Sequence, residues 1–289
     1  MAARLVRGRE LVRACRSQYV HRKAMTPELS PLHVERSGSG APVFLLHSSG
    51  LSGRQWKRLA SLVAGEGLRA VVPDLTGHGA SEPLLEPQAF SFREDVARTV
   101  ALLRTDGAAH LVGHSYGGLV ALQAAHRAPA LVRSLVLYDP VAFGVLDPTE
   151  DAAALRELGS LDLTWGPTES DRERWLRSFV DYWGGGAGAW SSLREEARAE
   201  FRRVAWVVRE GVRTLMEDLT PASSYRVVRA PIVVLTGEQS PLAVRSVVAR
   251  LGTTLAAKTR TIARAGHMGP MTHGDAVNAA VLEALAASS

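Results

Sequence analysis

The ten residues at positions 109–118, which read A-H-L-V-G-H-S-Y-G-G, have the composition of a nucleophilic turn. Gly113 and Gly117 flank Ser115 two residues away on either side, and a helical pattern begins at Tyr116. A serine on a tight strand-to-helix turn needs glycine at these positions because backbone crowds them. The N–H groups that open the helix can stabilise charge on an attacked carbonyl. The pattern predicts a nucleophilic serine, although a purely structural glycine-rich turn would also contain it.

A serine hydroxyl is a weak nucleophile at neutral pH, so it needs a base within hydrogen-bond reach. Of the nine histidines, His267 is the one placed to reach Ser115, because it lies between the last expected strand and the last helix. We expect His114 to be buried and to point away from the serine. We expect His78 to hold its own loop and His273 to lie at a helix start.

The elements that would position these residues alternate between strands and helices. Apolar or alternating runs predict strands near residues 31–36, 43–46, 70–72, 109–112, 135–138, 231–236 and 258–262. Apolar residues at helical spacing predict helices near residues 56–63, 92–104, 116–127, 244–251 and 274–286. This order predicts an α/β fold, with a mostly parallel sheet and helices on both faces. The chemistry of such sheets lies at the carboxyl ends of the strands.

Residues 141–225 break this alternation. They contain no convincing strand, they are helical and charged, and they hold five of the six tryptophans. We interpret this segment as a helical lid or cap, inserted into a core formed by residues 25–140 and 226–289. The tryptophans could simply stabilise the insertion. We expect Trp183 and Trp206 to wall an apolar substrate pocket.

The charge of the chain is concentrated at one end. The chain has a formal net charge of +5, but residues 1–24 carry seven basic side chains and one acidic one, which leaves the rest close to neutral. This distribution does not indicate a nucleic-acid partner. Residues 1–24 could be an organellar presequence, a segment before a start at Met25, or a helical tail, and we expect them to be non-catalytic. The single cysteine excludes an intramolecular disulfide, no apolar run could span a bilayer, and we expect a cytoplasmic protein.

Four motifs in order resemble the α/β-hydrolase-fold superfamily. They are L-L-H at 45–47, P-D-L-T-G-H-G-A-S at 73–81, G-H-S-Y-G-G at 113–118 and G-H at 266–267. The resemblance covers residues 30–140 and 226–287 and implies a serine-nucleophile member with a helical lid. Serine rather than aspartate at the turn argues against dehalogenases and epoxide hydrolases. The fold alone does not fix the substrate, because it supports many chemistries.

The loop after the strand at 43–46 departs from the family pattern. Members usually carry His-Gly there, whereas this chain reads His47, Ser48 and Ser49. Serine in place of glycine keeps the backbone N–H donors of this loop. The resemblance therefore implies an oxyanion hole made by the N–H groups of Ser49 and Tyr116. We also expect His47, Ser48 and Met268 to contact the substrate.

The acid that orients the histidine is the second departure. The resemblance places it after the strand at 231–236, where this chain has Ser240, which cannot hold an imidazolium. Two carboxylates could replace it. Asp139 ends the strand after the helix that follows Ser115, a place from which some members supply the acid. Glu238 lies close to the usual loop but would have to point inward. We favour Asp139 because it needs no detour of its side chain.

These residues predict a cofactor-independent serine hydrolase that cleaves a small or medium, partly apolar ester through an acyl-enzyme. Ser115 attacks, His267 moves the proton, and Asp139 orients the histidine. A carbon–carbon bond hydrolase, or a lyase or cyclase of a biosynthetic pathway, could use the same residues. The missing acid at Ser240 also leaves open a non-catalytic ligand-binding protein. We expect a small-molecule substrate and no metal, and the sequence does not specify the oligomeric state.

Overall fold

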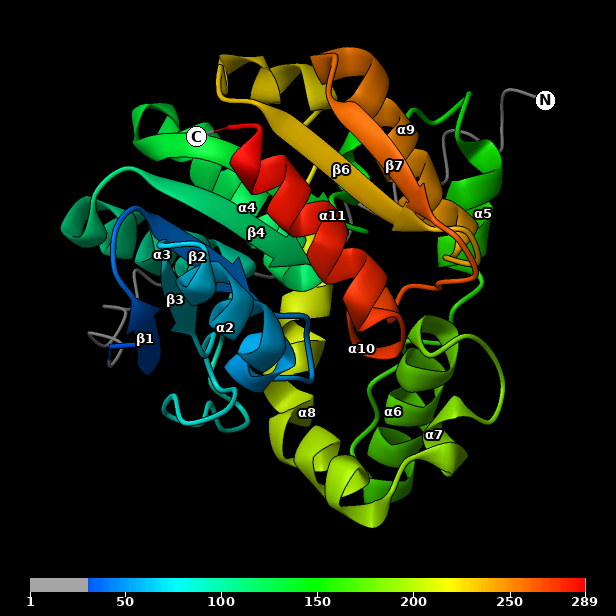
Figure 1. Ribbon diagram of the computed structural model, residues 1–289. Helices are drawn as coiled ribbons and strands as arrows, with labels where there is room; N and C mark the ends of the chain where they lie inside the picture. Colours follow the sequence, from blue (N-terminus) through cyan, green and yellow to red (C-terminus); the bar gives the residue numbers. More distant parts are fainter. Residues whose placement is uncertain (1–30, 289) are drawn as a thin grey trace, which may run out of the picture. The chain divides into compact units, whose positions relative to one another are not determined.

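The computed structural model describes residues 31–288, in which seven strands form one sheet of order β1-β3-β2-β4-β5-β6-β7 (Figure 1). The strands are β1 (Val34–Gly38), β2 (Pro42–Leu46), β3 (Arg69–Pro73), β4 (Ala109–His114), β5 (Val132–Tyr138), β6 (Ile232–Gly237) and β7 (Lys258–Ile262). β1 pairs antiparallel with β3, and every other pair is parallel. The predicted mostly parallel sheet is confirmed. Residues 1–24 lie outside the described residues.

Burial along the strands follows their place in the sheet. All residues of β2 and β4 are buried, as the apolar runs in their sequences predict for central parallel strands. Four of the five residues of β7 are exposed, which fits its position at the edge. The parallel register places Leu46 opposite Gly113, and His114 opposite Tyr138. The carboxyl ends of β2, β4 and β5 therefore meet at one edge.

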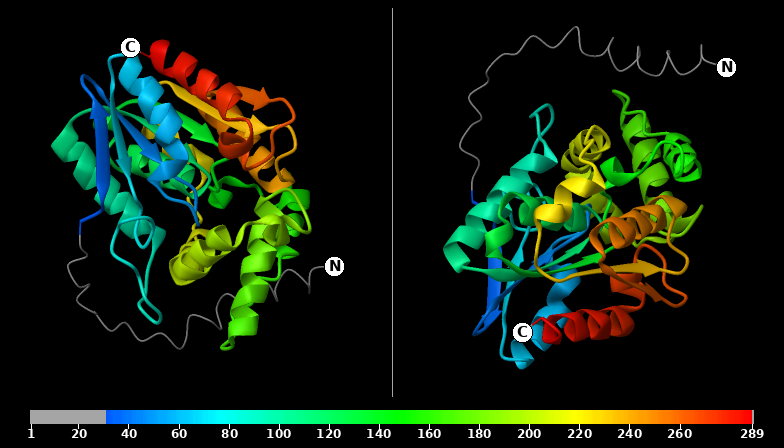
Figure 2. Two further views of the ribbon diagram at one scale, coloured as in Figure 1. Left: turned by 60° about the horizontal axis from the view of Figure 1, so that its bottom comes forward. Right: turned by 90° about the horizontal axis from the view of Figure 1, so that it is seen from above.

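Helices cover both faces of the sheet (Figure 2). Apolar residues of α3 (Phe92–Asp106), α4 (Tyr116–Arg127) and α9 (Leu242–Leu255) share one buried cluster. Those of α2 (Lys57–Gly65) and α11 (Gly274–Ala286) share a second cluster with the opposite side chains of the strands. The shorter helical segments are η2 (Gly53–Trp56), η3 (Pro129–Leu131), η4 (Phe143–Val145), η5 (Ala222–Val227) and α10 (Gly269–Thr272).

Local capping sets where two of the longer helices begin. The Ser91 side chain accepts from the N–H of Arg93 while the Glu94 carboxylate accepts from the N–H of Ser91, a capping box that starts α3. Thr168 and Asp171 form the equivalent box at the start of α6 (Glu169–Trp183). Such boxes satisfy N–H groups that would otherwise lack partners.

The segment 141–225 contains helices and no strand, as predicted. Its remaining α-helices are α5 (Ala152–Gly159), α7 (Ala189–Ser192) and α8 (Glu195–Met216). We call this segment the cap; α6, α7 and α8 lie beyond the carboxyl ends of the strands (Figure 1). Trp165 packs edge-on against both Trp175 and Trp206, within an apolar cluster that belongs mainly to the cap. Most of the cap tryptophans therefore stabilise the cap itself.

Within residues 31–288, no helix is both long and apolar enough to cross a bilayer.

Candidate active site

Ser115 lies on the turn between β4 and α4, in a conformation that few residues adopt. Its φ is 55° and its ψ is −116°, and its N–H donates to the carbonyl of Tyr138 at 3.0 Å. A positive φ strains a residue with a side chain, and such strain is concentrated at functional sites. A Cβ atom on Gly113 would lie 2.4 Å from the carbonyl oxygen of Gly117, and one on Gly117 would lie 2.3 Å from that of Leu46. Only glycine fits at these two positions.

His267 and Asp139 continue from the serine in a line of hydrogen-bonding groups. The Nε2 atom of His267 lies 2.9 Å from Oγ of Ser115, and its Nδ1 atom lies 3.3 Å from Oδ2 of Asp139. All three side chains are buried. In the tautomer that fits both contacts, Nδ1 donates to the carboxylate and Nε2 accepts from the serine hydroxyl. This is the geometry of a nucleophile, its base and an orienting acid.

The structure brings Asp139, and not Glu238, to the histidine. Asp139 is fully buried at the end of β5, where it accepts hydroxyl hydrogen bonds from Thr236 and Ser240. The Glu238 side chain is exposed and accepts the backbone N–H of Arg264 at 2.8 Å. The side chain of Glu238, the alternative acid, therefore lies in solvent and is not placed to orient His267.

Two strand-end side chains that the sequence analysis did not assign to the site hold the loop of His267. Nε2 of His114 donates to the carbonyl of His267, and the Tyr138 hydroxyl donates to the carbonyl of Gly266, both at 2.8 Å. Burial lowers the pKa of His114 well below its usual value, so the ring is neutral. Burial, together with the charge of Asp139, raises the pKa of Tyr138. The predicted burial of His114 is confirmed.

The backbone N–H groups of Ser49 and Tyr116 are available at the serine. Both residues line the same cavity as Ser115. Among residues 31–288, neither of these N–H groups donates a hydrogen bond to another residue. Tyr116 opens α4, so its N–H also lies at the positive end of a helix dipole. These are the two N–H groups from which the sequence analysis expected an oxyanion hole.

Two buried histidines hold the loop that carries Ser49. His47 donates from Nδ1 to the carbonyl of Ser48 at 2.8 Å and accepts the N–H of Leu75 at 2.9 Å. His78 accepts the N–H of Gly50 at 3.1 Å. Burial lowers the pKa of His47, and it lowers that of His78 to about 4, so both rings are neutral and can accept. The predicted structural role of His78 is confirmed.

An apolar cavity opens beside Ser115. None of the residues that line it carries a formal charge. From the core it is lined by Ser49, Ser115 and Tyr116. From the cap it is lined by Val141, Phe143, Leu158, Leu161, Leu163, Phe179, Tyr182, Trp183, Val212, Leu215 and Met216. The expectation that Trp183 lies at the pocket agrees with this lining.

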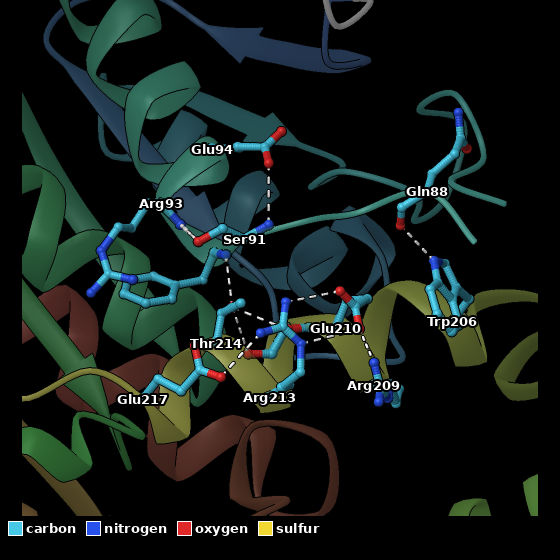
Figure 3. A network of polar contacts seen from close by, with 12 residues as sticks. Gln88, Ser91, Arg93, Glu94, Trp206, Arg209, Glu210, Arg213, Thr214 and Glu217 are labelled. Atoms are coloured by element: carbon cyan, nitrogen blue, oxygen red, sulfur yellow. Dashed lines mark hydrogen bonds and ion pairs between the residues drawn. The ribbon is translucent and has the colours of Figure 1, made fainter. Parts of the chain in front are cut away.

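The other four predicted substrate contacts need correction, because none of them lines the cavity. Trp206 packs in the cap and donates from Nε1 to the carbonyl of Gln88 at 2.8 Å (Figure 3). His47 is turned toward Leu75, and the N–H of Ser48 donates to the side chain of Gln55 at 3.0 Å. Met268 begins the turn of α10, and its carbonyl accepts the N–H groups of that turn. These contacts, made by the side chains of Trp206 and His47 and by the backbone of Ser48 and Met268, hold segments around the site.

Among the described residues, no group of three or more His, Cys, Asp or Glu side chains is arranged to hold a metal ion.

The fold is that of a known class of proteins. A family model described as the alpha/beta hydrolase family matches residues 43–280, and the chain belongs to this family. It is similar to "Lipase LipV" of Mycobacterium tuberculosis, with 41% identity over 113 residues, which are 38% of this chain and 41% of that protein. It is also similar to "2-hydroxymuconate semialdehyde hydrolase" of Pseudomonas sp. strain CF600, with 33% identity over 152 residues, 50% of this chain and 49% of that one. Both matches span less than half of the relative's own length.

A solved structure of a thermophilic esterase from Thermogutta terrifontis has the same fold. The two chains superpose with a TM-score of 0.63 and share 22% sequence identity. The superposition covers 89% of this chain and 93% of the esterase. The similarity extends over nearly all of both chains.

Proposed function

We propose that the protein is a serine esterase that cleaves small or medium esters with an apolar acyl or alcohol part. One observation carries this proposal. The hydrogen-bonded line of Ser115, His267 and Asp139 opens into a cavity whose walls are apolar and uncharged. A neutral apolar substrate makes few hydrogen bonds to water, so it can enter a cavity whose walls offer few hydrogen-bonding groups at little cost.

The reaction uses the groups at the carboxyl edge of the sheet. His267 takes the proton of Ser115 as its oxygen attacks the ester carbonyl, and Asp139 stabilises the imidazolium that forms. The N–H groups of Ser49 and Tyr116 bind the oxyanion. His267 then gives the proton to the leaving alcohol. A water molecule, deprotonated by the same histidine, releases the acid from the acyl-enzyme.

Carbon–carbon bond hydrolysis is the second candidate, because one relative is named as a hydrolase of 2-hydroxymuconate semialdehyde. A compound of that name carries a carboxylate. No arginine, lysine or histidine is among the residues that line the cavity in the described part of the chain. A carboxylate buried there would have no cation to pair with, which is costly. The cavity therefore favours a neutral ester.

A non-catalytic ligand-binding role was suggested by the missing acid at Ser240. Asp139 supplies a carboxylate to His267 from the neighbouring strand. This contact supports catalysis over that alternative.

Active-site labelling tests the proposal. A fluorophosphonate probe should label the native chain and the Ser134→Ala variant, which loses a buried hydroxyl away from the site. It should not label Ser115→Ala. Turnover of p-nitrophenyl esters should be faster for butyrate or hexanoate than for the anionic hemisuccinate. Failure to label Ser115 and to turn over any neutral ester would refute the proposal, and turnover of a vinylogous diketone acid by Ser115→Ala would favour the carbon–carbon alternative.

A further inference from the structure

The site holds its carboxylate between the ends of two neighbouring strands. β5 ends at Tyr138, so Asp139 is the first residue beyond it, and Ser240 lies three residues beyond the end of β6. The Ser240 hydroxyl donates to Oδ2 of Asp139 at 2.6 Å. This is the oxygen that faces Nδ1 of His267. Ser240, which occupies the position expected for the acid, therefore contacts Asp139, which supplies the carboxylate in its place.

The hydrogen bonds around Ser240 fix the direction of its hydroxyl. Its Oγ atom accepts the backbone N–H of Gly237 at 3.1 Å. Its own hydrogen is therefore available for Asp139, which can only accept when ionised. The second carboxylate oxygen accepts the hydroxyl of Thr236 at 2.6 Å.

These two hydroxyls take the place of water around a buried charge. Asp139 has a relative exposure of 0%, and a carboxylate without donors is very costly at such a site. The short O–H···O distances are typical of charge-assisted hydrogen bonds. Asp139 also has a φ of 44°, a left-handed conformation that is unfavourable for a residue with a side chain. The hydroxyls therefore fix both the charge and the orientation of the carboxylate.

We propose that Ser240 and Thr236 are positioning residues for Asp139, so that this acid orients His267 only while the two hydroxyls hold it. This inference rests on the proposed function.

Single variants test the proposal. Ser240→Ala and Thr236→Val should each lower kcat by about 10-fold or more, the effect expected from a lost hydrogen bond to a charged group, with KM almost unchanged. Thr236→Ser, which keeps the donor, should recover the activity lost in Thr236→Val. Ser134→Ala, which removes a buried hydroxyl bonded to His110, is the matched control and should keep the native kcat. Equal kcat values in Ser240→Ala, Thr236→Val and the native chain would overturn the proposal.

The rate of fluorophosphonate labelling separates this inference from the proposed function. Labelling depends on activation of Ser115 and not on the ester that is chosen. If the native chain is not labelled, the proposed function fails. If it is labelled, and Ser240→Ala and Thr236→Val react at the native rate, only the positioning role fails.

Discussion

The indole ring of Trp183 lies 4.2 Å from the imidazole ring of His267, measured between centroids, with the two planes inclined by 37°. Trp183 is the last residue of α6 and also lines the cavity. The cap therefore contacts the base itself, and it does so through an aromatic ring that can shield the imidazole from water. An aromatic face also attracts the positive charge that the base acquires during catalysis.

Replacement of Trp183 should weaken catalysis through both contacts. We expect Trp183→Ala to lower kcat/KM for an apolar ester by about 10- to 100-fold, and Trp183→Phe to keep most of the native value. Steady-state kinetics with p-nitrophenyl butyrate measures this. Trp206→Ala is the matched control, because Trp206 lies in the cap away from the cavity. Equal losses in the two alanine variants would mean that Trp183 acts only through the stability of the cap.

The two candidate acids should differ sharply in their effect on turnover. Asp139→Asn removes the charge that faces His267, so kcat should fall by about 10³- to 10⁴-fold. Glu238→Gln should leave kcat within about twofold, because this exposed side chain is hydrogen-bonded, within residues 31–288, to the backbone of Arg264 and not to His267. Thermal melts should show that both variants are folded. A large loss in Glu238→Gln with little effect in Asp139→Asn would contradict the assignment.

The buried neutral histidines should make the free energy of unfolding depend on pH. Burial lowers the pKa of His78 from 6.5 to about 4, and it also lowers the pKa values of His47 and His114. Between about pH 6.5 and pH 4 the unfolded chain binds more protons than the folded one. The contribution of these histidines to stability is therefore complete above about pH 6.5 and falls as the pH decreases. For His78 alone the loss should approach about 3 kcal/mol at pH 4.

Urea denaturation at pH 7, 6, 5 and 4.5 measures this dependence. The midpoint should decrease steadily with pH in the native chain. His78→Asn should be less stable at pH 7 but should lose less stability on acidification, whereas His273→Asn, at the start of a surface helix, should follow the native curve. A midpoint that stays constant from pH 7 to pH 4.5 would show that these histidines are not held neutral.

The contact between Gly50 and Phe201 should be sensitive to a single methyl group. Gly50 has a φ of 77°, and a Cβ atom there would lie 2.1 Å from the ring of Phe201 on α8. Gly50→Ala should therefore destabilise the protein by more than the about 1–2 kcal/mol of the left-handed conformation alone, and it should lower kcat by displacing Ser49. Thermal melts and esterase assays measure the two effects.

A second substitution separates the clash from the backbone strain. Phe201→Ala should relieve part of the instability of Gly50→Ala, because it removes the ring. Gly185→Ala is the control for strain alone, since Gly185 has a φ of 100° and no atoms near its missing Cβ. Equal destabilisation in Gly50→Ala and Gly185→Ala would show that the clash is relieved by movement of the cap.

Local sequence patterns were sufficient to predict the strands and helices of the core and two residues of the site, Ser115 and His267. Apolar runs predict the strands because parallel strands are buried on both faces, and glycines two residues from Ser115 mark its turn. His267 could be assigned because it follows the last strand. Asp139 was favoured over Glu238 for a similar reason, its position at the end of β5.

Side-chain contacts across the sheet could not be predicted in the same way. The hydroxyls of Thr236 and Ser240 reach Asp139 across about a hundred positions of sequence, and only the pairing of β5 with β6 brings them together. The sequence predicts the same role for Trp183 and Trp206, a wall of the substrate pocket. Their different roles depend on how α6 and α8 pack on the core, which helical periodicity does not reveal.

The attachment of the site to the sheet has a consequence for how the protein responds to heat. Ser115 follows β4, Asp139 follows β5, and the loop of His267 is held by side chains from the ends of both strands. Ser115, Asp139 and His267 are therefore tied to two central, paired strands, and they lose their alignment when those strands separate. Loss of activity on heating should then coincide with melting of the sheet, with no temperature range in which the chain is folded but inactive.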